Sequence, residues 1–167
     1  MNYEGYDSDE SDLEFGRDSF HPFSYKQQVV SEILTNKLYL TDMFAANDKS
    51  LLINRNIKGV ISLGGFEEQV HYTHHDGIEH HYVYIDDNED EPISEHFEEC
   101  VNFIDSIDGA VLVHCWAGIS RSSTIVIAYL MMKREMGYRE AFKFVQKKRT
   151  FICPNDGFLK QLNDICL

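Results

Sequence analysis

The stretch Ala110-Val111-Leu112-Val113-His114-Cys115-Trp116-Ala117-Gly118-Ile119-Ser120-Arg121-Ser122-Ser123 decides the fold of this chain. Its first four residues are apolar and mostly β-branched or long, which predicts a buried strand. The apolar segment 123–132 that follows is long enough for a buried helix. A loop between a strand and a helix points backbone N–H groups, and the positive end of the helix dipole, into its mouth. The sequence therefore predicts an anion-binding loop that contains Cys115.

This loop combines a nucleophile with groups that stabilise negative charge. The thiolate is the reactive form of cysteine, and helix N-termini and neighbouring cations favour it. Arg121 can grip two oxygens of a phosphate with its planar guanidinium, while loop amides bind the others. Gly118 lets the loop curl so that its N–H groups converge. Ser122 can donate a hydrogen bond to the sulfur and His114 can hold the loop from behind, so one short segment supplies the whole centre.

Two other interpretations of this stretch are weaker. A lone buried cysteine is usually a small core side chain. That explanation does not account for the histidine, glycine, arginine and serine at fixed offsets around Cys115. A nucleotide-binding loop requires the pattern G-x-x-x-x-G-K-[ST], which the chain lacks. Phosphate ester chemistry at Cys115 is therefore the preferred prediction.

The pattern H-C-x5-R-S at 114–122, placed after a strand, resembles the signature of cysteine-dependent protein phosphatases. The segment 114–123, followed by Ala-Tyr-Leu-Met at 128–131, looks like the dual-specificity branch of that family. Residues 36–40 (Asn-Lys-Leu-Tyr-Leu) resemble the family's first strand, and residues 154–158 (Pro-Asn-Asp-Gly-Phe) resemble the start of its last helix. The resemblance covers about residues 25–167.

The alternation of strands and helices predicts one α/β domain. The resemblance adds a central, mainly parallel sheet flanked by helices on both faces. It also implies hydrolysis of phosphotyrosine and phosphoserine or phosphothreonine in proteins, through a cysteinyl-phosphate and without a metal or other cofactor. The loop amides would bind the phosphate as the substrate-binding segment, whose members are Trp116, Ala117, Gly118, Ile119, Ser120 and Arg121.

Two alternatives to a protein phosphatase stay open. One is a phosphatase that acts on a non-protein phosphate such as a phosphoinositide, although the loop lacks the lysine of related lipid phosphatases. The other is a pseudophosphatase that binds phosphoproteins without turnover. Such relatives usually lack the nucleophile, whereas Cys115 is present. Turnover of an aryl phosphate separates these classes.

An acidic loop at 86–92 follows a predicted strand and can supply the proton that a leaving oxygen requires. In the resembled family this acid lies some ten residues before an aromatic residue of the following helix. Counting back from Phe97 selects Asp87, with Asp86 and then Glu89 as the alternatives. Asn155 resembles the family's asparagine that supports the catalytic loop, although an ordinary helix cap explains it equally well.

Composition restricts the protein classes further. The 167 residues suit a single domain with a full core. No apolar run is long enough to span a membrane, and the acidic start of the chain is unlike a signal peptide. A net charge of −13 disfavours nucleic acids and anionic membranes as partners. We expect an intracellular protein, cytoplasmic or nuclear, that acts on phosphorylated proteins. Its oligomeric state stays open and includes a homodimer.

Cysteine and histidine spacing does not predict a metal site. The four cysteines lack paired or metal-type spacing. Five histidines between positions 71 and 81 favour metal binding by composition, but no cysteine or compact ligand spacing accompanies them. We therefore expect no metal ligands among these residues, which are Cys100, Cys115, Cys153 and Cys166, and His71, His74, His75, His80 and His81.

Residues 1–23 are acidic and poor in apolar side chains, which predicts a disordered tail before a catalytic domain at 24–167. Asp42 and Ser94 are expected to cap helices, and Gly137 to end one. Strands are expected at 37–41, 60–63, 78–85 and 110–113. Helices are expected at 24–34, at 43–54, from 94, at 123–136, at 138–149 and from 155.

Overall fold

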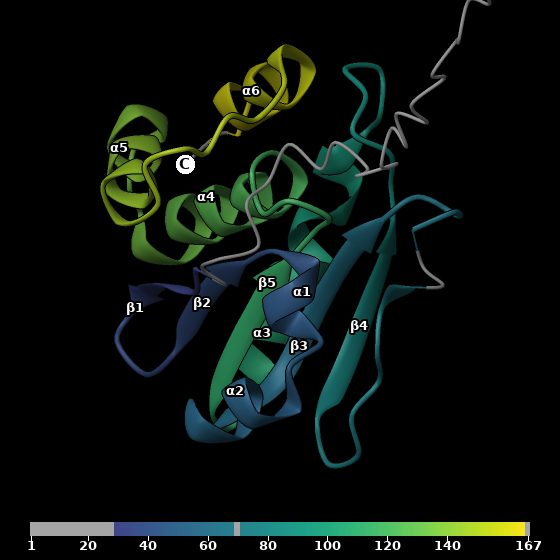
Figure 1. Ribbon diagram of the computed structural model, residues 1–167. Helices are drawn as coiled ribbons and strands as arrows, with labels where there is room; N and C mark the ends of the chain where they lie inside the picture. The colour runs from purple at the N-terminus through teal and green to yellow at the C-terminus, as the bar shows by residue number, and fades with distance from the viewer. Residues whose placement is uncertain (1–28, 69–70, 166–167) are drawn as a thin grey trace, which may run out of the picture.

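The computed structural model describes residues 29–68 and 71–165, which form the α/β fold of Figure 1. One five-stranded sheet has the order β1-β2-β5-β3-β4. β1 is antiparallel to β2, and the other neighbours are parallel. The predicted central, mainly parallel sheet is confirmed. Its strands are β1 (Ser31–Leu34), β2 (Leu38–Thr41), β3 (Ile57–Gly64), β4 (Glu79–Tyr84) and β5 (Ala110–His114).

Helices cover both faces of the sheet, as predicted. The short helices α1 (Met43–Ala46) and α2 (Lys49–Asn54) lie in front of it in Figure 1. They close a small core that includes Leu52 and Leu112. The other face carries a larger helical layer around α4. That layer consists of η2 (Ile93–His96), α3 (Phe97–Ser106), α4 (Arg121–Arg134), α5 (Tyr138–Lys148) and α6 (Asp156–Asn163).

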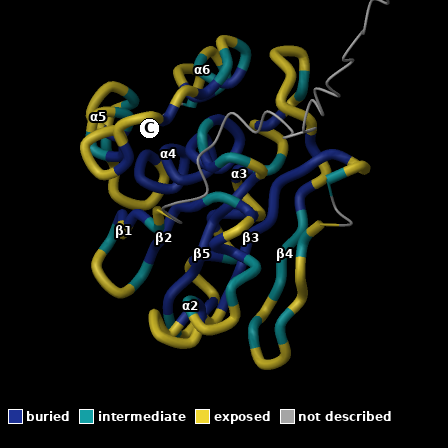
Figure 2. The backbone as a smooth tube through the Cα atoms, in the orientation of Figure 1, coloured by how far each residue is buried: buried dark blue, intermediate teal, exposed yellow. Residues whose placement is uncertain are grey.

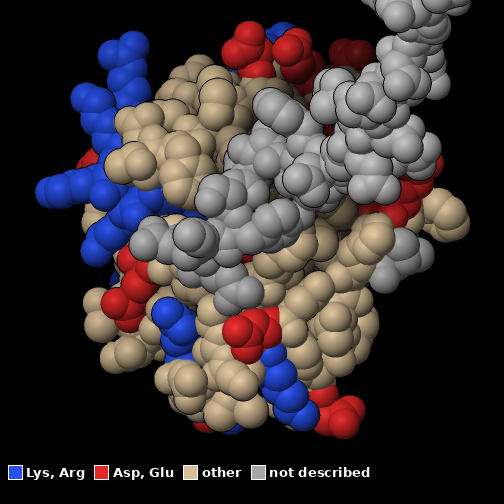
Figure 3. All heavy atoms as spheres, viewed as in Figure 1, with Lys and Arg blue, Asp and Glu red and all other residues tan. Residues whose placement is uncertain are grey.

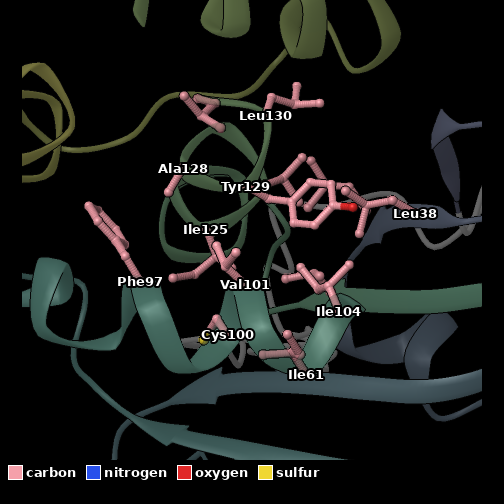
Figure 4. Close-up of a cluster of buried hydrophobic side chains, with 14 of the residues drawn as sticks. Leu38, Ile61, Phe97, Cys100, Val101, Ile104, Ile125, Ala128, Tyr129 and Leu130 are labelled. Atoms are coloured by element: carbon pink, nitrogen blue, oxygen red, sulfur yellow. The ribbon is translucent and has the colours of Figure 1, made fainter. Parts of the chain in front are cut away.

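β5 and α4 form the buried centre of the molecule (Figure 2). β5 lies between β2 and β3, and its side chains alternate between the two cores: Val111 and Val113 face the large one, Ala110 and Leu112 the small one. Burial on both faces explains its continuous apolar run. In α4 every residue from Arg121 to Met131 is buried. Figure 4 shows Ile125 and Tyr129 of α4 directed toward residues of α3 such as Val101 and Ile104, whereas Leu130 lies on the opposite side of α4.

The sequence prediction is wrong at the start of the domain. Residues 31–34 form edge strand β1, not the second half of a helix, and residues 24–28 lie outside the described part. The apolar spacing of so short a segment fits either structure. These residues form a strand because they pair with β2, where Ser31 lies opposite Leu40.

Three helix boundaries also differ from the prediction. Asp42 caps Ala45 N at 2.9 Å as expected, but Asp48 caps Leu51 N at 3.1 Å and starts a second helix within 43–54. Ser94 does not cap α3, because it lies within η2 and α3 begins only at Phe97, with His96 as the N-cap residue. α4 ends before Gly137, where Glu135 takes a left-handed conformation at φ +54°. A second capping residue, a 3-10 turn and a left-handed residue therefore set these three boundaries.

The predicted acidic tail at 1–23 lies outside the described residues, so the domain boundary stays a prediction. Within 29–68 and 71–165, no helix has the length and apolar character needed to cross a membrane.

Candidate active site

The loop between β5 and α4 begins at Cys115 and ends where α4 starts at Arg121. Gly118 has φ +67°, a left-handed conformation that side chains rarely adopt, and a Cβ there would clash with the carbonyl of Thr41. Ser120 is the N-cap residue of α4 but forms no side-chain capping hydrogen bond. The first N–H groups of the helix are therefore not occupied by its own cap.

Cys115 is nearly buried, and its Sγ lies 3.2 Å from Oγ of Ser122. His114 is fully enclosed, and burial lowers its pKa to about 4, so the ring is neutral at physiological pH. Its Nδ1 lies 3.3 Å from the carbonyl oxygen of Cys115, which can only accept, so Nδ1 carries the proton. Nε2 then accepts from Oγ of Ser62 at 2.7 Å. His114 thus ties the start of the loop to β3, behind the sulfur.

Arg121 is held by a residue that the sequence did not single out. Its Nη1 and Nη2 donate to the two carboxylate oxygens of Glu68, at 2.5 and 3.0 Å, and Nη1 also donates to the carbonyl of Ile85. Burial alone would lower the pKa of Arg121, but its hydrogen bonds to Glu68 and nearby negative charges raise it above its ordinary value. The guanidinium therefore stays charged in an enclosed position.

Nε of Arg121 is buried and has no hydrogen-bond partner among the described residues. It lies 3.8 Å from Oδ2 of Asp87, too far for a hydrogen bond. A buried guanidinium N–H without a partner is costly, and an anionic oxygen in the mouth of the loop would satisfy it.

Asp87 is held by two donors, one from the loop and one from the start of α6. Its Oδ1 accepts from Oγ of Ser120 at 2.7 Å and from Nδ2 of Asn155 at 3.0 Å. Asn155 also caps α6, with its Oδ1 accepting from Phe158 N. The geometry therefore fits both interpretations of Asn155, as a helix cap and as a support for the loop.

The two alternative acids lie elsewhere in the same acidic segment. The carboxylate of Asp86 packs against Gly65, and the backbone of Glu89 packs against Gly157. Within the described residues, neither side chain hydrogen-bonds to the loop, in contrast to Asp87. The catalytic roles of all these residues stay predictions, but the fold brings Asp87 rather than Asp86 into contact with Ser120.

The structure assembles one group with metal-ligand chemistry that sequence spacing did not predict. Donor atoms of His81 on β4 and of Glu99 and Cys100 on α3 lie within 4.8 Å of one another. Burial raises the pKa of the Cys100 thiol, and Nε2 of His81 lies 3.4 Å from Oε1 of Glu99. The group is therefore a histidine–carboxylate contact beside a protonated core thiol. It is not part of the loop that contains Cys115.

Comparison with known proteins agrees with this fold and identifies its family. The family model described as "Dual specificity phosphatase, catalytic domain" matches residues 38–166. Dual specificity protein phosphatase 1 of Arabidopsis thaliana is 37% identical over 145 residues, which cover 85% of this chain and 72% of that protein. Human dual specificity protein phosphatase 5 is 36% identical over 86% of this chain and 37% of its own length. The chain belongs to the dual-specificity phosphatase family, in the protein tyrosine phosphatase superfamily.

A solved structure gives the same result for the fold. The human tyrosine phosphatase-like serine/threonine/tyrosine-interacting protein superposes with a TM-score of 0.77 and 36% identity, over 83% of this chain and 95% of that one. Since the chain covers little more than a third of the human phosphatase above, similarity extends to the catalytic domain and not to the rest of that protein.

Proposed function

We propose that this protein is a metal-independent protein phosphatase that hydrolyses phosphotyrosine and phosphoserine or phosphothreonine through a cysteinyl-phosphate. The observation that carries the proposal is the unpartnered, buried Nε of Arg121 on the same short loop as Cys115. The names of the related dual specificity protein phosphatases support proteins as the substrate class. A phosphate bound in the loop mouth would satisfy Nε and the amides from Trp116 to Arg121.

In the first step the thiolate of Cys115 attacks phosphorus, an S–P bond forms and the P–O bond to the leaving group breaks. Asp87 gives its proton to the leaving oxygen. Oδ1 of Asp87 already accepts two hydrogen bonds, so Oδ2 is the oxygen that carries the proton. Arg121 and the loop amides stabilise the equatorial oxygens, where negative charge is concentrated during transfer.

In the second step the carboxylate of Asp87 takes a proton from water, and the water oxygen attacks phosphorus. The S–P bond breaks and inorganic phosphate is released. The hydroxyl of Ser122, 3.2 Å from Sγ, donates to the departing thiolate. His114 keeps the loop aligned from behind and takes no proton, because burial lowers its pKa to about 4.

We further propose an intracellular setting, cytoplasmic or nuclear. Cys100, Cys115 and Cys153 are all free, as expected where thiols are kept reduced. Phosphorylated proteins are the proposed partners, with nucleic acids and membranes disfavoured by the net charge of −13.

Turnover of p-nitrophenyl phosphate in the presence of EDTA tests the proposal. Cys115→Ser should reduce kcat by a factor of at least about 1,000, as expected for loss of a nucleophile. Cys153→Ser, at an exposed cysteine, is the matched control and should retain activity. A wild-type protein that binds vanadate without any turnover would instead be a phosphoprotein-binding pseudophosphatase. Turnover of phosphoinositides but not of phosphopeptides would favour the non-protein alternative.

The role of Asp87 is tested with two leaving groups. Asp87→Asn should reduce kcat about 100-fold or more for a phosphopeptide, whose leaving oxygen needs a proton, and less for p-nitrophenyl phosphate. Asp86→Asn is the matched control. A loss confined to Asp86→Asn would move the general acid to that residue.

A further inference from the structure

Arg149 is a buried cation that the proposed chemistry does not use. It follows directly after α5, is 2% exposed and is among the largest fully buried side chains of the described residues. Within 29–68 and 71–165 no carboxylate lies within ion-pair distance of it. Burial of a charge without a counter-ion is costly unless hydrogen bonds compensate for it. Its neighbours Lys147 and Lys148 are exposed, so Arg149 differs from the other basic residues at the end of α5.

All three guanidinium nitrogens of Arg149 donate to backbone carbonyls. Nε donates to the carbonyl of Gly118 at 2.7 Å, Nη2 to that of Ala117 at 3.3 Å and Nη1 to that of Val29 at 2.7 Å. The ring of Phe151 covers the guanidinium, with its centroid 4.3 Å from Cζ. Two of the three acceptors therefore belong to the loop that contains Cys115.

These contacts determine where the loop N–H groups point. A trans peptide unit is planar, so its C=O and N–H point in opposite directions. The carbonyl of Ala117 shares a peptide unit with the N–H of Gly118, and the carbonyl of Gly118 shares one with the N–H of Ile119. Because Arg149 holds both carbonyls on one side, both N–H groups are turned to the other side. The positive φ of Gly118 is what allows two successive units to do this.

Arg149 also places a positive charge behind the loop. Burial lowers its pKa, but the negative charges of Asp42 and of Cys115 oppose this effect. Arginine stays protonated in proteins, so the residue is a cation in the folded state. Since the attraction between two charges is mutual, a cation that Cys115 stabilises in turn favours the thiolate of Cys115.

We propose that Arg149 is a positioning residue of the phosphate site, which acts through the loop and never touches substrate. It holds the amides of Gly118 and Ile119 in the orientation that binds an oxyanion, and its charge favours the thiolate of Cys115. This inference rests on the proposed function only in taking the loop mouth as the place where phosphate binds. The competing explanation is that Arg149 merely fills space between α5 and the loop.

Two measurements that need no turnover separate these explanations. The first is the dissociation constant of vanadate. The second is the pH dependence of Cys115 alkylation by iodoacetamide, measured by mass spectrometry on the peptide that contains Cys115, in a Cys153→Ser background that removes an exposed thiol. The other groups near the sulfur or near Arg149 are the same in every variant: Asp42, Glu68, Tyr72, Asp87, His114 and Arg121.

Arg149→Met should weaken vanadate binding about tenfold or more. This loss should stay smaller than the roughly 100- to 1,000-fold decrease in rate that follows when an oxyanion donor is removed outright. It should also shift the alkylation midpoint upward by about 0.5–1 pH unit, below the effect of a contacting charge. Arg149→Lys keeps the charge but not the three-way donor fork. It should return the midpoint to near that of the wild type, while vanadate binding stays weakened.

Lys147→Met, which removes an exposed cation from the same helix, is the matched control and should change neither quantity by more than about twofold. If Arg149→Met is folded and behaves like Lys147→Met, the proposal is overturned. If Arg149→Met fails to fold, Arg149→Lys decides. Vanadate affinity equal to that of the wild type would then leave Arg149 a purely structural role. A protein without turnover would refute the proposed function but would leave both readouts valid.

Discussion

At the scale of single residues, Glu68 determines how Arg121 is presented to a ligand. Its two carboxylate oxygens occupy Nη1 and Nη2 and leave Nε of Arg121 without a partner. A long arginine side chain would otherwise sample many rotamers, and fixing it before binding lowers the entropy cost of holding phosphate. Glu68 also lies near the hydroxyl of Tyr72, whose ring packs edge-on against His114. One carboxylate therefore links the arginine to the support behind Cys115.

We predict that Glu68→Gln lowers kcat/KM for an aryl phosphate by about 10- to 100-fold, because an amide cannot accept two charge-assisted hydrogen bonds from one guanidinium. Steady-state kinetics check this. Glu67→Gln, at the exposed neighbouring residue, is the control and should behave like the wild type. Equal kinetics for the two variants would show that Arg121 needs no carboxylate partner.

At the scale of secondary structure, α4 is the element on which the domain depends. Its first turn forms the end of the candidate site, and it contacts α3, α5, α6 and the sheet. Side chains on all sides of α4 are buried from Arg121 to Met131, so it lacks the polar face of a surface helix. Packing around the whole helix therefore holds the loop that contains Cys115 in place.

Leu130→Ala should reduce the free energy of unfolding by about 2–5 kcal/mol, because a fully buried leucine leaves a cavity when it is truncated. Urea denaturation followed by circular dichroism measures this. Met132→Ala, two positions further on and 36% exposed, should cost less than about 1 kcal/mol. Similar losses for both variants would contradict the burial of Leu130 in the core around α4.

At the scale of the whole molecule, charge is unevenly distributed. Figure 3 shows lysine and arginine side chains gathered over α5, and acidic side chains at other places of the same face. The exposed cations of α5 are Arg139, Lys143, Lys147 and Lys148. The net charge of −13 would repel an anionic substrate, so the local field of the loop and its arginines has to attract it.

Stability should fall between pH 6.5 and pH 4. Burial lowers the pKa of His114 and of His80 to about 4, and the neighbouring His74 and His75 add to the effect on His80. Unfolded histidines titrate near pH 6.5. The unfolded chain therefore binds more protons in this window, and the free energy of unfolding decreases as the pH falls through it. For the enclosed His114 the loss amounts to about 3 kcal/mol.

His80→Gln tests the pH dependence without touching the candidate site. Nε2 of His80 accepts from the backbone N–H of His75, which glutamine can also satisfy. The variant should show a smaller drop in Tm between pH 6.5 and pH 4 than the wild type, whereas His71→Gln, at an exposed histidine, should not. Identical pH profiles for all three proteins would exclude His80 as a source of acid instability.

The strand, loop and helix around Cys115 could be predicted because their residues are contiguous. Continuous apolar runs indicated burial, and Gly118 and Arg121 lie within a few residues of Cys115. Local periodicity failed at residues 31–34, where four residues fit a helix or a strand and only pairing with β2 decides. The same limit applies to Asp87, which the sequence selected by counting but could not place against Ser120.

The amino-acid order thus determined which residue types lie in the loop that contains Cys115, and which class of fold surrounds that loop. Glu68, Ser62 and Arg149 had no signal in the sequence, because each acts on the loop from a distant segment. Their roles depend on which strands become neighbours and on which side chains are left without water. Hydrogen bonds to a buried guanidinium form only when folding removes the solvent that would otherwise satisfy it.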